Sequence, residues 1–196
     1  MIRYYITSRE TLGGADALLR EVRRACAAGV DWIQLREKQI AARELELLAS
    51  RLLKQMGEFT PRPKLLLHSR ADVALAVGAD GIHLGSGAQA LSAAEVRAVW
   101  PAALIGVSCH TRQQVALAEA QGADFAVFGP VFEKAGVRNP HGLELLREVC
   151  HRSDAARPPM PVLALGGVTA ENTALCIDAG AAGIAGIRLF QGQWQV

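Results

Sequence analysis

The chain lacks the features that mark membrane-bound, secreted and nucleic-acid-binding proteins. No apolar stretch reaches the roughly 18 residues that a membrane-spanning helix needs. The first residues have no apolar signal-peptide core. No basic run appears, and a net charge of +2 is too weak to indicate a nucleic-acid footprint. We therefore expect a cytoplasmic protein that binds neither membrane nor nucleic acid.

Cysteines are few and widely spaced. Cys26, Cys109, Cys150 and Cys176 form no Cys-x-x-Cys pair. This pattern favours small buried thiols in a reducing compartment over disulfides or a metal site. Low-complexity segments are also absent. With 196 residues, of which 51% are hydrophobic, residues 1–196 are expected to form one domain with a sizeable core.

A five-residue motif that begins with glycine recurs four times along the chain, and we call each copy a glycine phrase. Each copy follows a helical pattern and begins a strand-like run. Such a glycine is typical of a helix C-cap in the left-handed conformation. The copies lie about 45 to 58 residues apart, which fits two βα units between successive copies. The phrases occupy residues 29–33, 78–82, 122–126 and 180–184.

Four further apolar runs supply the strands between these phrases. All eight runs are short and hardly alternate, as expected for parallel strands covered on both faces. The pattern predicts a (β/α)₈ barrel whose eighth helix is very short or missing, in a chain shorter than the roughly 250 residues typical of this fold. The additional strands are expected at 2–6, 64–67, 104–107 and 161–165, and helices at 15–28, 43–56, 71–77, 93–99, 112–121, 143–152 and 170–179.

Barrels of this kind carry their active sites at the C-terminal ends of the strands. Gly166 and Gly167 follow the seventh strand, and Gly186 and Ile187 end the eighth. Glycine turns let backbone N–H groups approach an anion closely, and the last two strands often hold a phosphate. The alternative is that these glycines only make tight turns.

Gln34, Arg36 and Lys38 are spaced by two, so a strand places them on one face. Inward-facing Arg and Lys need an anionic partner, because burying unpaired charge is costly. A bound phosphate or carboxylate fits this need, and an ion pair with an acid such as Glu133 is the alternative.

His68, His83 and His110 stand at the ends of three strands. Each lacks a local acidic partner, so we expect no metal site from them. Since imidazole titrates near neutral pH, His68 and His110 are candidates for a general acid or base.

Five segments at these strand ends resemble the thiamine phosphate synthase/TenI superfamily, in order and over nearly the whole chain. The resemblance implies a (β/α)₈ barrel of thiamin biosynthesis. Its synthases join a pyrimidine pyrophosphate to a thiazole phosphate, releasing pyrophosphate with the help of Mg²⁺. TenI-type members bind the same thiazole phosphate, and some tautomerise it. The segments are residues 34–38 (QLREK), 79–84 (ADGIHL), 105–110 (IGVSCH), 128–132 (FGPVF) and 164–168 (ALGGV).

The resemblance also implies residue roles. Gly166, Gly167, Gly186 and Ile187 would bind the thiazole phosphate. Gln34, Arg36 and Lys38, with Ser108 nearby, would face the pyrimidine pyrophosphate or a substrate carboxylate.

The sequence departs from the synthase pattern at three loops. His68-Ser69 replaces the usual Asn-Asp, and residues 85–88 replace Gly-Gln-Glu-Asp, so the usual Mg²⁺ carboxylates are absent. Residues 133–138 replace the loop that carries Thr and Lys, and Pro130 stands where TenI tautomerases have histidine.

Three hypotheses follow from these departures. The leading one is a TenI-like enzyme that binds thiazole phosphate and transfers a proton without metal, with His68, His110 or Glu133 as base. The alternatives are a divergent thiamine phosphate synthase, for which alone Mg²⁺ is expected, and a non-catalytic ligand-binding or regulatory barrel. A homo-oligomer is a further hypothesis, because Leu189, Phe190 and Trp194 offer apolar surface beside the truncated end.

Overall fold

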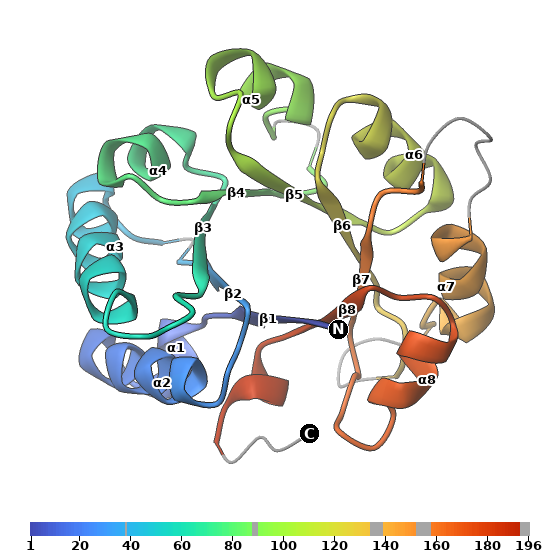
Figure 1. The fold of residues 1–196 in the computed structure, drawn as a ribbon, viewed down its shortest axis with the longest axis horizontal. Coiled ribbons are helices and arrows are strands. Elements are labelled where there is room, and N and C mark those ends of the chain that lie inside the picture. Colours follow the sequence, from blue (N-terminus) through green and yellow to red (C-terminus); the bar gives the residue numbers. More distant parts are fainter. Residues whose placement is uncertain (38, 88–89, 134–138, 152–157, 193–196) are drawn as a thin grey trace.

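The computed structural model describes residues 1–37, 39–87, 90–133, 139–151 and 158–192. Eight parallel strands form a closed barrel in sequence order, and β8 pairs with β1 (Figure 1). This confirms the predicted (β/α)₈ barrel. The strands are β1 (Ile2–Ile6), β2 (Trp32–Leu35), β3 (Lys64–His68), β4 (Gly81–Leu84), β5 (Leu104–Cys109), β6 (Phe125–Phe128), β7 (Val162–Leu165) and β8 (Gly183–Gly186).

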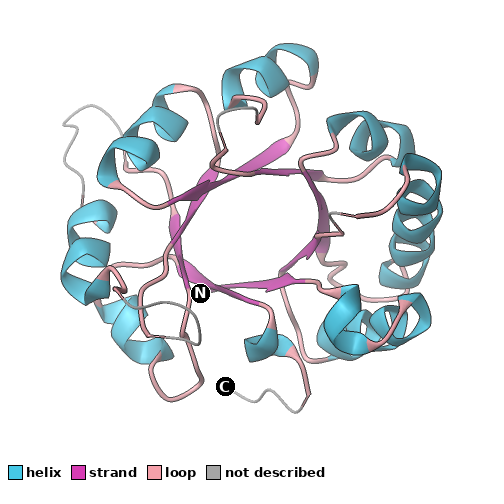
Figure 2. Cartoon of the chain, turned by 180° about the vertical axis from the view of Figure 1, so that it is seen from behind, coloured by secondary structure: helices cyan, strands magenta, loops and turns pink. Residues whose placement is uncertain are grey.

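Helices surround the barrel on its outside (Figure 2). Most begin and end within a few residues of the predicted bounds, and a short α1 (Arg9–Leu12) had not been expected. None of the described helices has both the length and the hydropathy needed to cross a bilayer. The others are α2 (Ala15–Ala27), α3 (Ala42–Met56), α4 (Ala71–Val77), α5 (Ala93–Val99), α6 (Arg112–Ala120), α7 (Gly142–Cys150) and α8 (Thr173–Asp178).

The predicted start of the last helix was wrong: α8 begins at Thr173, whereas the sequence predicted residue 170. Asn172 explains the delay. Its side-chain oxygen accepts a hydrogen bond from the Thr169 N–H at 2.8 Å, and its amide donates to the Gly167 carbonyl at 2.9 Å. Asn side chains that bond to nearby backbone in this way favour a turn over a helix.

The four glycine phrases have the expected backbone. Gly29, Gly78, Gly122 and Gly180 have φ values of +79°, +68°, +83° and +96°. This left-handed conformation ends a helix at little cost only when the residue lacks a side chain. The predicted left-handed conformation of the glycine at each of these αβ junctions is confirmed.

The aspartates in three of these phrases tie neighbouring strands together. Asp124 accepts a hydrogen bond from the Ile105 N–H at 2.7 Å and pairs with Arg97 at 2.8 Å. Asp31 and Asp80 bond in the same way to the backbone N–H groups of Arg3 and Leu65, both at 2.8 Å. Each carboxylate thus satisfies a backbone donor near the start of the preceding strand.

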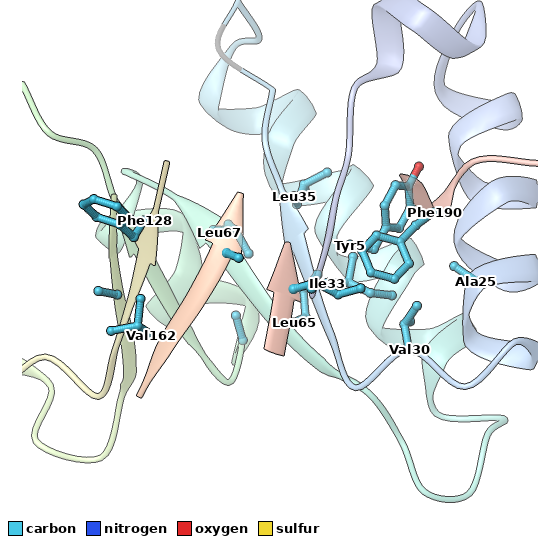
Figure 3. Close-up of a cluster of buried hydrophobic side chains, with 14 of the residues drawn as sticks. Tyr5, Ala25, Val30, Ile33, Leu35, Leu65, Leu67, Phe128, Val162 and Phe190 are labelled. Carbon is cyan, nitrogen blue, oxygen red and sulfur yellow. The ribbon is translucent and has the colours of Figure 1, made fainter. Parts of the chain in front are cut away.

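Side chains alternate between the barrel interior and the surrounding helices. Tyr5 and Ile33 point outward, toward α2 and its neighbours (Figure 3). Tyr4 points inward and packs edge-on against Phe125, with ring centroids 5.4 Å apart. Alternation on each strand therefore decides which residues can reach the interior and which build the outer core. The four cysteines are buried, as predicted, and this includes Cys109.

The helix that would follow β8 in a complete (β/α)₈ barrel is reduced to a 3₁₀ turn, Arg188–Phe190. Phe190 is 1% exposed, its ring lies 6.2 Å from that of Tyr5, and its carbonyl accepts a hydrogen bond from Arg24. Phe190 is therefore a core residue of this chain, which corrects its assignment to an apolar surface left for a partner subunit. Leu189 is half-buried, and Trp194 lies outside the described residues.

Candidate functional site at the C-terminal ends of the strands

The polar side chains of the site come from the inward positions of β2 to β5. Gln34 on β2 is 1% exposed and faces Tyr4, which points into the barrel. Arg36, two residues further along the chain, contributes a positive charge that helps to lower the pKa of the inward His83. These two residues therefore occupy one side of the strand, as their spacing predicts. Lys38, the third member of the pattern, lies outside the described residues.

Thr7 and Glu37 fix the backbone around Arg36. The Thr7 hydroxyl accepts from the Arg36 N–H at 3.0 Å and donates to Glu37 Oε1 at 3.1 Å. Burial raises the pKa of Glu37, and its bonds to the Arg9 N–H and Thr7 oppose this rise. Arg36 itself lines a cavity of about 230 Å³. The loop after β1 thus positions Arg36 at a small cavity that Ser8, Glu10, Glu37 and Gln39 also line.

A buried chain of hydrogen bonds crosses the barrel interior. The Tyr4 hydroxyl lies 3.2 Å from His83 Nδ1, and His83 Nε2 lies 2.8 Å from Ser108 Oγ. The pKa of His83 is lowered to about 3, chiefly by burial and to a smaller extent by the positive charges of His68 and Arg36. The imidazole is therefore neutral near pH 7. Sequence reasoning noted His83 but gave it no role, although it lies two residues from Gly81, directly after the glycine phrase.

The three candidate catalytic residues are separated around the rim. The His68 ring stacks on that of His83, with centroids 6.2 Å apart. The His110 Nδ1–H donates to the Gly129 carbonyl, with 2.5 Å between the heavy atoms. Glu133 approaches Gly167 through its backbone. No contact among these three side chains is found within the described residues, so the structure does not assemble them into one acid–base group.

His141 is a rim residue for which sequence reasoning gave no chemical role. Its ring lies 6.5 Å from that of His110 and 5.0 Å from that of Phe128. Its Nε2 is buried and has no hydrogen-bond partner in the described structure. Nothing in the sequence indicated this position, because His141 precedes a helix and is far from any strand end along the chain.

The Gly166-Gly167 turn is shaped by packing. The two residues have φ values of +93° and +67°. A Cβ on Gly166 would lie 2.6 Å from Pro130 Cα, and one on Gly167 would lie 2.6 Å from the Glu133 carbonyl oxygen. Packing against the loop after β6 therefore already requires glycine at both positions. The proposed phosphate role of these residues stays a prediction.

The turn after β8 lies beside this one. Leu165 pairs with Ala185 across β7 and β8, so Gly166 and Gly186 follow on neighbouring strands, and Ile187 comes next. No helix begins directly after Gly167, because α8 starts at Thr173. An anion here would meet the N–H groups of two adjacent turns rather than a helix end.

The residues after β3 and β4 do not fit Mg²⁺. The described part of these loops offers His68, Ser69, Gly85, Ser86 and Gly87, with no carboxylate among them. Within the described residues no group of three or more His, Cys, Asp or Glu side chains could hold a metal ion. Mg²⁺ prefers oxygen ligands that include carboxylates, and these side chains do not supply them.

A closed (β/α)₈ barrel with this cationic, histidine-rich rim belongs to the barrels whose ligand sites lie at the C-terminal ends of the strands. The family model described as thiamine monophosphate synthase matches residues 3–190. The chain belongs to this family, which acts in thiamine biosynthesis.

The relatives carry the synthase name. A protein of Geobacter sulfurreducens named "Putative thiamine-phosphate synthase" is 44% identical over 186 residues, which cover 93% of this chain and 83% of the relative. The thiamine-phosphate synthase of Syntrophomonas wolfei is 36% identical, over 96% of this chain and 88% of its own. The structure of thiamine phosphate pyrophosphorylase from Pyrococcus furiosus superposes with a TM-score of 0.81 at 29% identity, over 95% and 85% of the two chains. These names favour the synthase hypothesis over the TenI-like one that the sequence alone placed first.

Proposed function

We propose that this protein is a thiamine-phosphate synthase, a transferase that couples a pyrimidine pyrophosphate to a thiazole phosphate. The observation that carries the proposal is the match to the synthase family over residues 3–190, because this stretch includes all eight strands of the barrel except the first residue of β1. In the proposed reaction the thiazole takes the place of pyrophosphate on the pyrimidine. Residues 1–196 would act as one domain that holds both substrates.

The rim offers each substrate a distinct binding group. Arg36 can bind the pyrophosphate through its planar guanidinium, with Lys38 as the proposed second cation and the buried Gln34 as a further polar group. The adjacent turns at Gly166, Gly167, Gly186 and Ile187 would donate backbone N–H groups to the thiazole phosphate. Positive charge aimed at the departing pyrophosphate is what the reaction requires, and Arg36 can supply it without a metal.

A coupled assay tests this proposal. The protein is incubated with both substrates in Mg²⁺, without added metal and with EDTA, and thiamine phosphate is measured. We expect product, and we expect Arg36→Ala to lower kcat/KM by about 10- to 100-fold through the loss of a charge-assisted contact. Arg147→Ala is the matched control, because Arg147 pairs with Glu144 on the surface of α7. Absence of product under all three conditions would overturn the proposal.

Tautomerisation of the thiazole phosphate remains the second candidate function. One observation favours it, because the described residues fit a metal-free reaction better than one that needs Mg²⁺. His110 would be the base. Since its Nδ1–H donates to Gly129, a neutral ring keeps its lone pair on Nε2.

The tautomerase assay separates this candidate from the others. Isomerisation that is lost in His110→Ala and kept in His151→Ala would support it, since His151 is an exposed histidine at the end of α7. Tight binding of thiazole phosphate without turnover in either assay would instead indicate the non-catalytic ligand-binding barrel.

A further inference from the structure

Ser108 ends a buried series of polar groups that runs through three strands. The series passes from Tyr4 to His83 at 3.2 Å and from His83 to Ser108 at 2.8 Å. Ser108 is partly exposed and lines a cavity of about 260 Å³ beside the loop after β4. The inner members of the series are buried, whereas its last hydroxyl is accessible to a ligand.

The direction of these hydrogen bonds follows from the burial of Tyr4. Its side chain is fully buried, and His83 Nδ1 lies within hydrogen-bond distance of its hydroxyl. A buried hydroxyl proton without an acceptor is costly, so the Tyr4 hydroxyl donates to His83 Nδ1.

In a neutral His83 ring, the direction of the bond from Tyr4 decides the direction of the bond to Ser108. Burial keeps His83 unprotonated near neutral pH, so one ring nitrogen carries the hydrogen and the other carries the lone pair. If Nδ1 accepts from Tyr4, Nε2 carries the hydrogen and donates it to Ser108 Oγ. The serine oxygen then has a fixed donor, and its proton is free to point away from His83.

We propose that Tyr4 and His83 are positioning residues that fix the Ser108 hydroxyl as a hydrogen-bond donor toward a lone-pair acceptor on the bound substrate. The identity of that substrate rests on the proposed function, whereas the direction of the hydrogen bonds does not. Neither Tyr4 nor His83 needs to touch the ligand. Tyr4 packs against Trp32 and Phe125, so its ring also holds the hydroxyl in place.

The tautomer of His83 tests the direction without any assay of activity. Nitrogen chemical shifts of ¹⁵N-labelled histidine distinguish the Nε2–H form from the Nδ1–H form. We expect His83 of the wild-type protein to be the Nε2–H form at pH 7, and Tyr4→Phe to lose this preference. Tyr5→Phe is the matched control, because it removes a buried hydroxyl from the same strand on the outward side. An Nδ1–H form in the wild type, or no change in Tyr4→Phe, would overturn the proposal.

A double-mutant cycle tests whether Tyr4 acts through Ser108. We expect Ser108→Ala to lower kcat/KM of the coupling reaction about 10-fold and Tyr4→Phe about 5-fold, the size of one lost neutral hydrogen bond. Tyr4→Phe should cause no further loss once Ser108 is alanine. Additive losses would show a general structural effect and would contradict the proposal. If the coupling reaction itself is absent, the proposed function fails while the tautomer measurement still decides the hydrogen-bond direction.

Discussion

The neutral His83 predicts a specific loss of stability in mild acid. Its pKa is 6.5 in an unfolded chain and about 3 in the folded barrel, where burial and the facing charges of His68 and Arg36 oppose protonation. Above pH 6.5 both states are neutral at this residue, and the pKa difference has little effect. Below pH 6.5 the unfolded state binds a proton that the folded state cannot bind, so the free energy of unfolding falls as the pH falls.

The magnitude follows from the size of the shift. At about 1.36 kcal/mol per pKa unit, the full penalty approaches roughly 4.8 kcal/mol near pH 3. Between pH 7 and pH 5 the same linkage removes about 2 kcal/mol. This loss is large for a domain whose total stability is on the order of 5–15 kcal/mol.

Urea denaturation at pH 7 and pH 5 measures this loss. His83→Gln removes the titrating group, so the variant should lose about 2 kcal/mol less than the wild type over this interval. His151→Gln, at an exposed position, should behave like the wild type. An NMR titration of the wild-type His83 ring provides a second measurement that does not depend on how the variant folds. Equal losses in wild type and His83→Gln, or a titration midpoint above pH 5, would refute the reasoning.

Three further predictions concern single substitutions. In thermal unfolding, Gly167→Ala should destabilise the protein by at least about 3 kcal/mol, because the new Cβ would overlap a carbonyl oxygen. Gly78 has a similar φ but open space around it, so Gly78→Ala should cost only about 1 kcal/mol. Asp124→Ala should cost about 1–3 kcal/mol by the same measurement, because it leaves the Ile105 N–H without its acceptor. Arg36→Ala should weaken binding of inorganic pyrophosphate about 10-fold or more in calorimetry, with thermal stability unchanged, and unaltered binding would contradict its assignment.

The sequence was sufficient for the scaffold because the signals for a (β/α)₈ barrel are local. A glycine such as Gly78 marks the end of a helix by its own backbone preference, and the following apolar run marks a strand. The spacing of these phrases then counted the strands. The Gln34 and Arg36 pattern was equally local, since strand geometry alone places every second residue on one side.

The reaction could not be read in the same way, and here the first choice among the hypotheses was not the one that the relatives favour. Changed loops after the third, fourth and sixth strands directed sequence reasoning toward a TenI-like enzyme. The match to the synthase family depends instead on similarity distributed over residues 3–190. Sequence reasoning thus gave a few substituted loop residues more weight than the similarity of the rest of the chain to the synthase family.

What the sequence determined by itself is the order of the strands, the glycine junctions and the inward face of β2. What only the tertiary structure decided is which of the inward residues meet. Tyr4, His83 and Ser108 lie on three different strands and are separated by 79 and 25 positions along the chain. Closure of the barrel brings them within hydrogen-bond distance, and burial there makes His83 neutral. Contacts of this kind depend on strand register and on exclusion of water, and no local pattern of residues records either.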